Sequence, residues 1–193
     1  WSNHRRWCDY IQNVYSEYYM QVADGRTTEN TPVSHMDKNL GHEDVDNPYY
    51  LSVEFDIRNM WKVQYYGNGL YALQSMAKLD MTLTTGKTPG IQEPTAIIKS
   101  SGSENNALTV DMLWTIELDE NGYYFQKNGT DSATLYAPNL NRSTHPYLVT
   151  SEYDADILNC HWKFIQPSPE LLIYKDLAYD NDITISITPG ETL

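Results

Sequence analysis

The sequence predicts an all-β fold built from three repeats of about 50 residues each. First, WKVQYYGNGLY at 61–71 recurs as WTIELDENGYY at 114–124: each opens with Trp, has a β-branched residue two places later and reaches Asn-Gly before a closing Tyr. Second, Trp7, Trp61, Trp114 and Trp162 recur at intervals of about 50 residues, which leaves room for four short strands per repeat. Third, 16 Tyr and 5 Trp against only 3 Phe suit strands with one buried and one wet face.

Short strands are expected at matching places in each repeat. A β-rich run, a polar turn and a second run follow three of the Trp residues, at 69–86, 122–139 and 170–190. Further strands are expected at 47–55, 94–102 and 145–153, where an aromatic or β-branched run has Pro at or near its start. No segment keeps the apolar period of a helix, so the chain should be almost entirely β.

Three such repeats close most economically into a β-trefoil, a barrel capped by hairpins. Closure removes the exposed edges that about twelve short strands would otherwise leave. It would also bring the regions around Cys8 and Cys160, the only two cysteines, close enough to allow a single disulfide bridge.

The segments around three of the Trp residues resemble the repeat of the ricin-type β-trefoil lectins. These segments are MWKV at 60–63, LWTI at 113–116 and HWKF at 161–164, and the resemblance covers roughly residues 8–166. In that family the Trp ends a Gln-x-Trp motif and packs in a shared core, which implies one buried Trp per repeat. This chain departs from the motif, because Asn59, Met112 and Cys160 stand where the family has Gln.

The resemblance also implies a sugar site in each repeat, formed by an acidic residue, an aromatic ring and an amide just before the Gln-x-Trp motif. A carboxylate or amide binds paired sugar hydroxyls, while a ring covers the apolar C–H face. The acidic position maps to Gln21, Asp80 and Tyr136 in the successive repeats, and the amide position maps to Arg58, Asp111 and Asn159. The ligand-binding residues expected from this mapping and its neighbours are Gln21, Asp24, Tyr49, Tyr50, Arg58, Asn59, Asp80, Asp111, Tyr147 and Asn159.

No repeat presents the complete set of sugar-binding groups. The first has two rings but no carboxylate at the mapped acidic position, and it is favoured as the binding repeat. The second, next in preference, has Asp80 and Asp111 and offers Lys99 where a ring is needed. The alternative is that Asp24 and Asp80 only cap turns and that the tyrosines only pack in strands.

No motif in the sequence requires an enzyme. Asp80 and Asp111 could perform glycosidase chemistry only if they faced each other about 5 to 10 Å apart in a cleft. The five His lack metal-ligand spacing, and the chain contains no CxxC, no GxSxG and no Gly-rich phosphate loop. We therefore expect a non-catalytic module that needs no cofactor and no metal, although it could be the accessory domain of a larger enzyme.

The charge balance excludes some classes of binding partner. With 26 acidic against 13 basic residues, the chain has a net charge of −13 and should repel nucleic acid and anionic lipid. The sequence contains no window of about 18 apolar residues, which a membrane-spanning helix would need. The expected partner is a glycan or polysaccharide, bound outside the cell or at the cell surface.

Residues 167–193 are expected to be a C-terminal extension of the trefoil. They either complete the first repeat or begin a following domain, and we favour the second, with neighbouring domains in a longer chain. Two other functions compete with sugar binding. One is an interaction or spacer domain that kept the trefoil core, and the other is a protease-inhibitor-like trefoil that uses the loop at 24–35 with Arg26.

Overall fold

The computed structural model describes residues 7–36, 59–101, 108–129, 133–139 and 147–165, and the statements below concern these residues. They form twelve strands and three short 3₁₀ helices, so the all-β prediction is confirmed. The 3₁₀ helices are η1 (Ala23–Gly25), η4 (Val110–Met112) and η5 (Leu158–Cys160). The strands are β1 (Trp7–Asn13), β2 (Tyr19–Val22), β3 (Val33–Met36), β4 (Met60–Gly67), β5 (Leu70–Ser75), β6 (Met81–Gly86), β7 (Thr95–Ser100), β8 (Trp114–Leu118), β9 (Tyr123–Lys127), β10 (Thr134–Tyr136), β11 (Val149–Ser151) and β12 (Trp162–Ile165).

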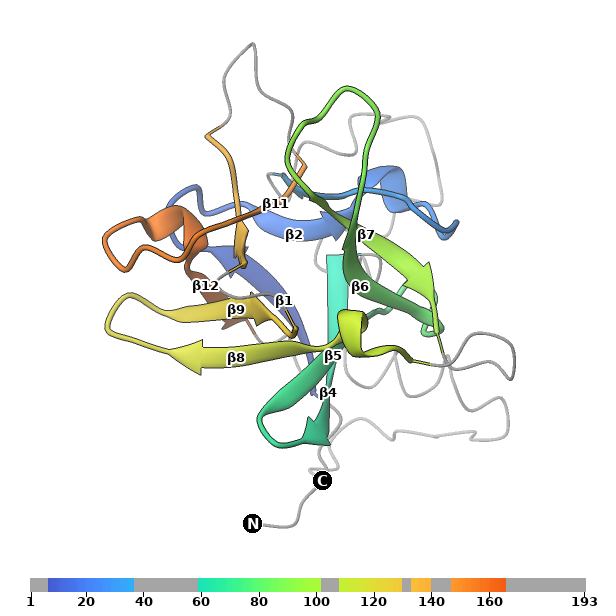
Figure 1. Cartoon of the computed structure of the whole chain (residues 1–193), viewed down its shortest axis with the longest axis horizontal. Helices are drawn as coiled ribbons and strands as arrows, with labels where there is room; N and C mark the ends of the chain where they lie inside the picture. The colour runs from blue at the N-terminus through green and yellow to red at the C-terminus, as the bar shows by residue number, and fades with distance from the viewer. Residues whose placement is uncertain (1–6, 37–58, 102–107, 130–132, 140–146, 166–193) are drawn as a thin grey trace, which may run out of the picture.

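Six of the strands close into a barrel. Strand β1 pairs with both β12 and β4, and the ring continues through β5, β8 and β9 back to β12. The other six form the hairpins β2–β3, β6–β7 and β10–β11. In Figure 1 the labelled strands of these hairpins lie above β4, β5, β8 and β9. A six-stranded barrel capped by three hairpins is a β-trefoil, which confirms the predicted fold class.

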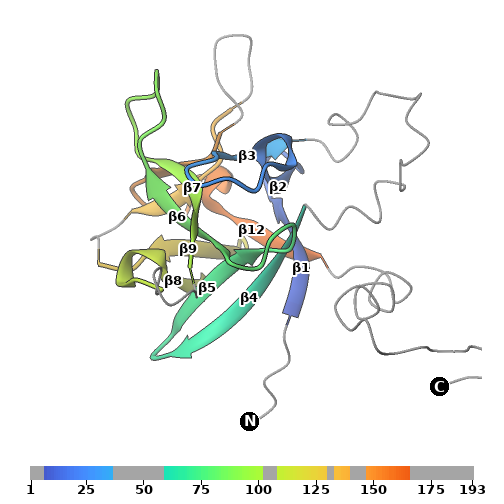
Figure 2. The ribbon, with the colours of Figure 1, turned by 90° about the vertical axis from the view of Figure 1, so that its right-hand side faces the viewer.

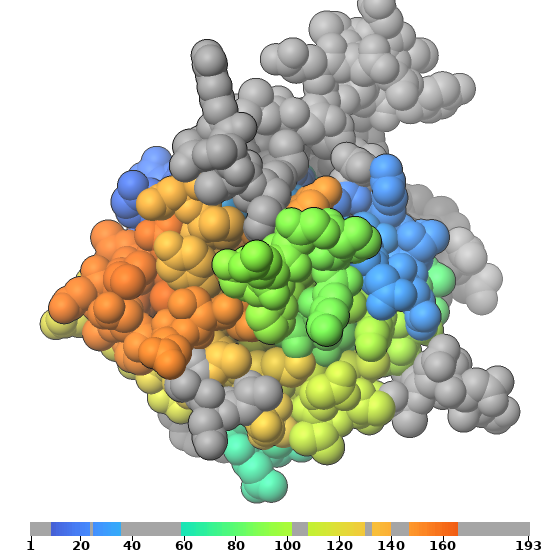
Figure 3. Space-filling model, turned by 45° about the horizontal axis from the view of Figure 1, so that its top comes forward, coloured from blue at the N-terminus to red at the C-terminus, as the bar shows by residue number. Residues whose placement is uncertain are grey.

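The three hairpins meet around one residue from each. The backbone N–H of Leu148 donates to the carbonyl of Val33, and the N–H of Ala96 donates to the carbonyl of Leu148, both at 2.8 Å. All three side chains are fully buried. Figure 3, with this end turned forward, shows β6–β7 in green between the blue first repeat and the orange third repeat. The small apolar side chains at the centre allow the close approach that closes the barrel.

Each repeat contributes one Trp to the core, as the family resemblance implied. Trp114 and Trp162 begin the fourth strand of their repeats, Trp61 is the second residue of its fourth strand, and none has exposed surface. Their indole N–H groups donate to the carbonyls of Met20, Leu83 and Leu135, at 2.9, 3.1 and 3.3 Å. Trp7 was grouped with these residues by its spacing, but it begins a first strand and its backbone pairs with Val63. The repeats are therefore β1–β4, β5–β8 and β9–β12.

The residues that replace the family's Gln lie just before each Trp and are buried. Asn59, Met112 and Cys160 are 4%, 5% and 0% exposed. Cys160 is a free thiol, and burial raises its pKa to about 11. A bridge from Cys160 to Cys8 is therefore not formed in the structure.

Two of the further strands expected from the sequence are present as β7 and β11, the latter shorter than predicted. The expected strand at 47–55 and the extension at 167–193 lie outside the described residues, so those expectations stay predictions. The loop at 24–35 is fixed against β7, because Asn30 donates its backbone N–H to Ile98 and Ile98 donates to Thr31, at 2.9 and 3.0 Å.

Candidate functional site

The indole hydrogen bonds identify equivalent positions in the three repeats. Because Met20, Leu83 and Leu135 accept equivalent bonds, the residues that follow them are also equivalent: Gln21, Thr84 and Tyr136. The sequence mapping put Gln21 and Tyr136 at these equivalent positions, but in the second repeat the equivalent residue is Thr84 and not Asp80. That this position binds a sugar stays a prediction. The mismatch arose because Asp80, in the turn before β6, is the nearest carboxylate along the chain.

Asp80 lies in that turn, away from the equivalent position. Its carboxylate is 3.6 Å from the ammonium of Lys78, and its carbonyl accepts the backbone N–H of Ser101 at 2.6 Å. The structure therefore gives Asp80 partners different from those of Asp111, and these contacts do not form the carboxylate pair considered for glycosidase chemistry.

Asp111, which the mapping put at the amide position before the Trp motif, contacts the second strand of its own repeat. The hydroxyl of Thr84 donates to the carbonyl of Asp111 at 2.8 Å and lies 3.4 Å from its Oδ2. Thr109 donates to Oδ1 of Asp111. The hydrogen bond from Thr109 lowers the pKa of this carboxyl, and Lys127 and Thr84 lower it further against the effect of burial. Asp111 is thus an exposed carboxylate that is held charged and oriented.

A cation lies beside this carboxylate. Lys127, at the end of β9, stands opposite Trp114 in the strand register, and its ammonium donates to the hydroxyl of Thr85. Burial lowers the pKa of Lys127, Asp111 raises it, and Lys99 lowers it again. We call Thr84, Thr85, Asp111 and Lys127 the second-repeat site. It brings a hydrogen-bond acceptor and a donor to neighbouring residues of β6, and such groups suit sugar hydroxyls.

In the third repeat the counterpart of Asp111 is Asn159, and its side-chain amide is already hydrogen-bonded within the protein. The Asn159 amide donates to the carbonyl of Ala137 at 2.7 Å and to Oδ1 of Asn139 at 3.0 Å. The backbone carbonyl of Asn159 accepts a hydrogen bond from the side-chain amide of Asn13 at 2.9 Å, and Asn159 is 6% exposed. Asn159 therefore braces η5 against β10, which is a structural role.

Tyr147 does not occupy the ring position expected for the third repeat. In the register of the capping hairpins, Ser151 is the counterpart of Lys99, because Thr134 pairs with Ser151 as Thr82 pairs with Lys99. Tyr147 lies before β11, where its backbone pairs with Ser34.

The first repeat is described only in part. Gln21 lies in β2 opposite Ser34, and Asn59 is buried beneath the start of β4. Asp24 belongs to η1 by its backbone. Tyr49, Tyr50 and Arg58 lie outside the described residues, so the preference for this repeat stays a prediction.

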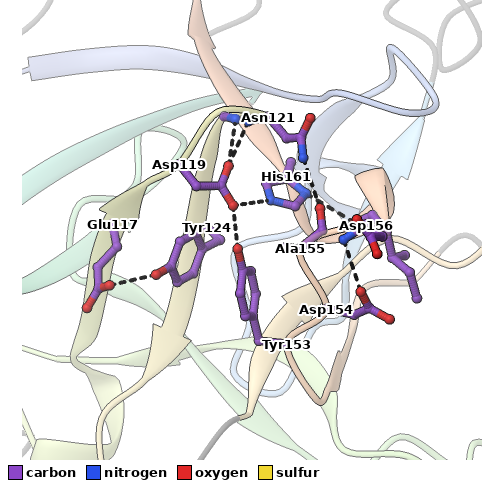
Figure 4. Close-up of polar contacts among 11 residues, drawn as sticks. Glu117, Asp119, Asn121, Tyr124, Tyr153, Asp154, Ala155, Asp156 and His161 are labelled. Atoms are coloured by element: carbon purple, nitrogen blue, oxygen red, sulfur yellow. Dashed lines mark hydrogen bonds and ion pairs between the residues drawn. The ribbon is translucent and has the colours of Figure 1, made fainter.

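A second polar cluster was missed by the sequence analysis (Figure 4). Asp119, in the β8–β9 turn, accepts the backbone N–H groups of Asn121 and Gly122 on Oδ1, at 2.8 and 3.2 Å. Its Oδ2 accepts the Tyr153 hydroxyl and lies 2.9 Å from Nε2 of His161. Burial on its own raises the pKa of Asp119, but the bonds from Tyr153 and His161 outweigh it and hold the pKa at about 2. The signal in the sequence is the Asp-x-Asn-Gly turn, whose partners are distant in the chain.

The rest of this cluster is also internally satisfied. The other ring nitrogen of His161 faces the carbonyl of Ile157 at 3.1 Å, and the side chain is fully buried. Tyr124 stacks on Tyr153 with ring centroids 4.3 Å apart and donates its hydroxyl to Glu117 at 2.6 Å. The bond to Glu117 raises the pKa of Tyr124 to about 12. The cluster connects the β8–β9 turn to the segment before β12. Because its polar groups already have partners, it is a weaker candidate for ligand binding than the second-repeat site.

Two searches of the described residues add no further site. They contain no group of three or more His, Cys, Asp or Glu arranged to hold a metal ion. They also contain no helix that is long and apolar enough to cross a membrane.

Comparison with known proteins identifies the fold. No protein-family model and no curated protein sequence matches the chain. Among solved structures, it is similar to ThreeFoil, a designed protein with threefold symmetry, with a TM-score of 0.60, 14% identity and coverage of 82% of this chain and 98% of that one. It is also similar to the Rhizoctonia solani agglutinin, with a TM-score of 0.61, 14% identity and coverage of 86% and 98%. The ricin B-like lectin of Macrolepiota procera, solved in complex with lactose, gives a TM-score of 0.57, 15% identity and coverage of 86% and 100%.

Proposed function

We propose that this chain is a non-catalytic carbohydrate-binding module that uses its second-repeat site. The observation that carries the proposal is that neighbouring residues of β6 hold an acid and a base: Thr84 contacts Asp111, and Thr85 accepts a hydrogen bond from Lys127. Both follow Leu83, the strand position that the indole bond of Trp114 defines. The likeness to an agglutinin and to a lectin solved with lactose supports the ligand class. The low identity leaves the fold as the shared property, so the sugar-binding assignment depends on this chain's own residues.

The second-repeat site has the donors and acceptors that a sugar needs. One hydroxyl of an adjacent pair would donate to the Asp111 carboxylate, and the other would accept from Lys127. Thr84, which is fully buried, fixes the backbone of Asp111 from beneath, so little ordering is required when a ligand arrives. Lys99 stands where the family resemblance needs a stacking ring, which favours weak binding per site and avidity from several copies.

The carboxylates of the described residues argue for binding and against hydrolysis. A glycosidase needs one carboxyl that stays protonated as the general acid, which requires a raised pKa. Asp111 has a lowered pKa, and that of Asp119 is about 2. Neither is poised to give a proton to a leaving sugar near neutral pH.

The proposal also covers the cellular location of the module and its neighbouring domains. We propose that it acts outside the cell or at the cell surface, where glycans are accessible, and that neighbouring domains of a longer chain supply catalysis or adhesion. The net charge of −13 disfavours nucleic acid and anionic lipid as partners.

The first test is a glycan-array screen of the purified chain and of the Asp111→Asn variant. Loss of a charged hydrogen-bond partner weakens an interaction by about 1.5 to 3 kcal/mol, so binding should fall roughly tenfold to a hundredfold. Asp80→Asn is the matched control, because it removes an exposed carboxylate of the same repeat outside the site. Circular dichroism should show that both variants keep the fold.

Equal binding by the Asp111→Asn variant and the unchanged chain would show that the second-repeat site is not the binding site. No binding to any array glycan would leave a trefoil spacer or an inhibitor-like domain as the better function. The second alternative would then be tested by protease inhibition with an Arg26→Ala variant.

A further inference from the structure

The β4–β5 hairpin exposes tyrosine rings at the end of the molecule away from the capping hairpins. Tyr65 is 58% exposed and Tyr66 is 45% exposed, although both lie in strand β4. Figure 2 shows β4 and β5 extending away from β2, β3, β6 and β7. These rings are far along the hairpin from Trp61, which is fully buried in the barrel.

Two of the rings form a defined pair. Tyr65 and Tyr71 face each other in the strand register, with ring centroids 5.1 Å apart and ring planes inclined at 48°. The backbone N–H of Gly69 lies 3.4 Å from the Tyr65 hydroxyl and points to it, which steadies the exposed ring. Asn68 and Gly69 have φ of 52° and 77°, the left-handed pair typical of a tight two-residue hairpin turn. The pair is therefore presented on a stiff element, ready for a ligand without reordering.

Folding alone does not require tyrosine at Tyr65. Three cross-strand pairs lie on the same face of this hairpin, in order from the barrel to the turn: Trp61 with Ser75, Val63 with Leu73, and Tyr65 with Tyr71. The first of these pairs is buried in the barrel, whereas the Tyr65 ring is mostly in water, so a polar side chain would serve the fold equally well.

We propose that the Tyr65–Tyr71 pair is a second carbohydrate site, which takes a single chain of a neutral polysaccharide. Tyrosine combines an apolar face for the C–H surface of a sugar ring with a hydroxyl for hydrogen bonding. Because the two rings are inclined at 48°, they do not form one flat platform, so the pair suits a single chain better than the flat face of a crystalline fibre. The site shares no residue with the second-repeat site, so each can exist without the other.

The charge of the molecule favours this occupant over two others. With a net charge of −13, the chain repels anionic polysaccharides and a second copy of itself. A neutral polymer of hydroxylated rings meets no such repulsion.

The test is native affinity electrophoresis in gels that contain a soluble neutral polysaccharide. Laminarin, galactomannan and xyloglucan are the probes, with polygalacturonate as the anionic comparison and microcrystalline cellulose pull-down as the flat comparison. At least one neutral polymer should retard the unchanged chain, while polygalacturonate and cellulose should not bind it. Tyr65→Ala should weaken binding by about tenfold, and Tyr65→Phe, which keeps the stacking face, should retain most of it.

Matched variants separate this site from the other. Tyr15→Ala removes a ring of similar exposure, 56%, from the β1–β2 turn and should leave retardation unchanged. Asp111→Asn should also leave it unchanged, because the two sites are independent. Retardation that survives Tyr65→Ala, or that Asp111→Asn abolishes, would overturn the second site while leaving the proposed function intact. If no neutral polymer retards the unchanged chain, the second site is wrong, whatever the glycan array shows.

Discussion

Asp119 shows how one carboxylate can hold together segments that are far apart in the chain. It accepts two backbone N–H groups of its own turn and two side chains, Tyr153 and His161, from the last quarter of the trefoil. The ionised form is the one that accepts all four bonds, which is why the pKa of Asp119 is lowered. Charge at this residue is therefore linked to folding.

This linkage predicts a pH-dependent contribution to stability. The ordinary pKa of the carboxyl is 3.8 and the folded value is about 2, so the unfolded chain binds its proton first as pH falls. The stabilisation by Asp119 should be fully present above about pH 4 and should disappear as pH falls through about 2. Urea unfolding from pH 6 to pH 2 should show lower stability for Asp119→Asn at pH 6 and a smaller loss on acidification.

The control for this prediction is Glu120→Gln, which changes the adjacent exposed carboxylate. It should reproduce the pH profile of the unchanged chain. Identical profiles for Asp119→Asn and the unchanged chain would show that the hydrogen bonds of Asp119 contribute no net stability.

Residue-level prediction from the sequence depends on how far apart the interacting residues lie in the chain. Asp111 was selected because it lies next to a Trp segment, and in the structure it contacts the second strand of its repeat. Asp80 was misplaced because strand register cannot be read from composition, and a shift of a few residues moves a side chain out of a site. The Asp119 cluster was missed because its members are about 40 residues apart and meet only when the barrel closes.

The two Asn-Gly turns between barrel strands differ in how much space surrounds the glycine. Gly69 in the β4–β5 turn has φ of 77° and open space around its missing side chain. Gly122 in the β8–β9 turn has φ of 142°, and an added Cβ would lie 3.0 Å from the carbonyl oxygen of Trp162 and 3.3 Å from Val14. Both turns contain Asn-Gly in the sequence, but only the second is pressed against another strand.

Alanine at each of these glycines should separate backbone strain from crowding. Gly69→Ala should destabilise the protein by about 1 kcal/mol, because only the left-handed conformation opposes it. Gly122→Ala should destabilise it by about 2 kcal/mol or more, because the backbone of β12 must also move. Equilibrium urea unfolding gives both values, and an equal loss in the two variants would contradict the crowding at Gly122.

For the molecule as a whole, the recurring Trp segments were enough to predict the fold. Three of the Trp residues fall at the same place in each repeat, and each donates to an equivalent carbonyl. Trp7 was placed in the same series because spacing along the chain cannot distinguish a first strand from a fourth. The number of repeats and barrel closure were predictable because exposed edges are unfavourable in any sheet of short strands.

The net charge predicts how the whole molecule responds to salt. A charge of −13 on a chain of 193 residues is self-repulsive, and added ions screen that repulsion. The thermal midpoint at pH 7 should rise as NaCl increases from low concentration to about 0.15 M, the range in which screening grows most. At a pH near 4.6, where the net charge is close to zero, the same addition should have little effect. An equal salt response at both pH values would show that self-repulsion does not limit stability.

The pairing of β1 with β12 has a consequence for how a ribosome makes this protein. Tyr10 lies beside Ile165, so the first strand synthesised waits for the last one before the barrel can close. While translation proceeds, β1 can find β4, but its other edge stays open and able to pair with another nascent chain. The trefoil must therefore finish folding after residue 165 has left the exit tunnel, and slow release at that point would favour aggregation between neighbouring chains on the same message.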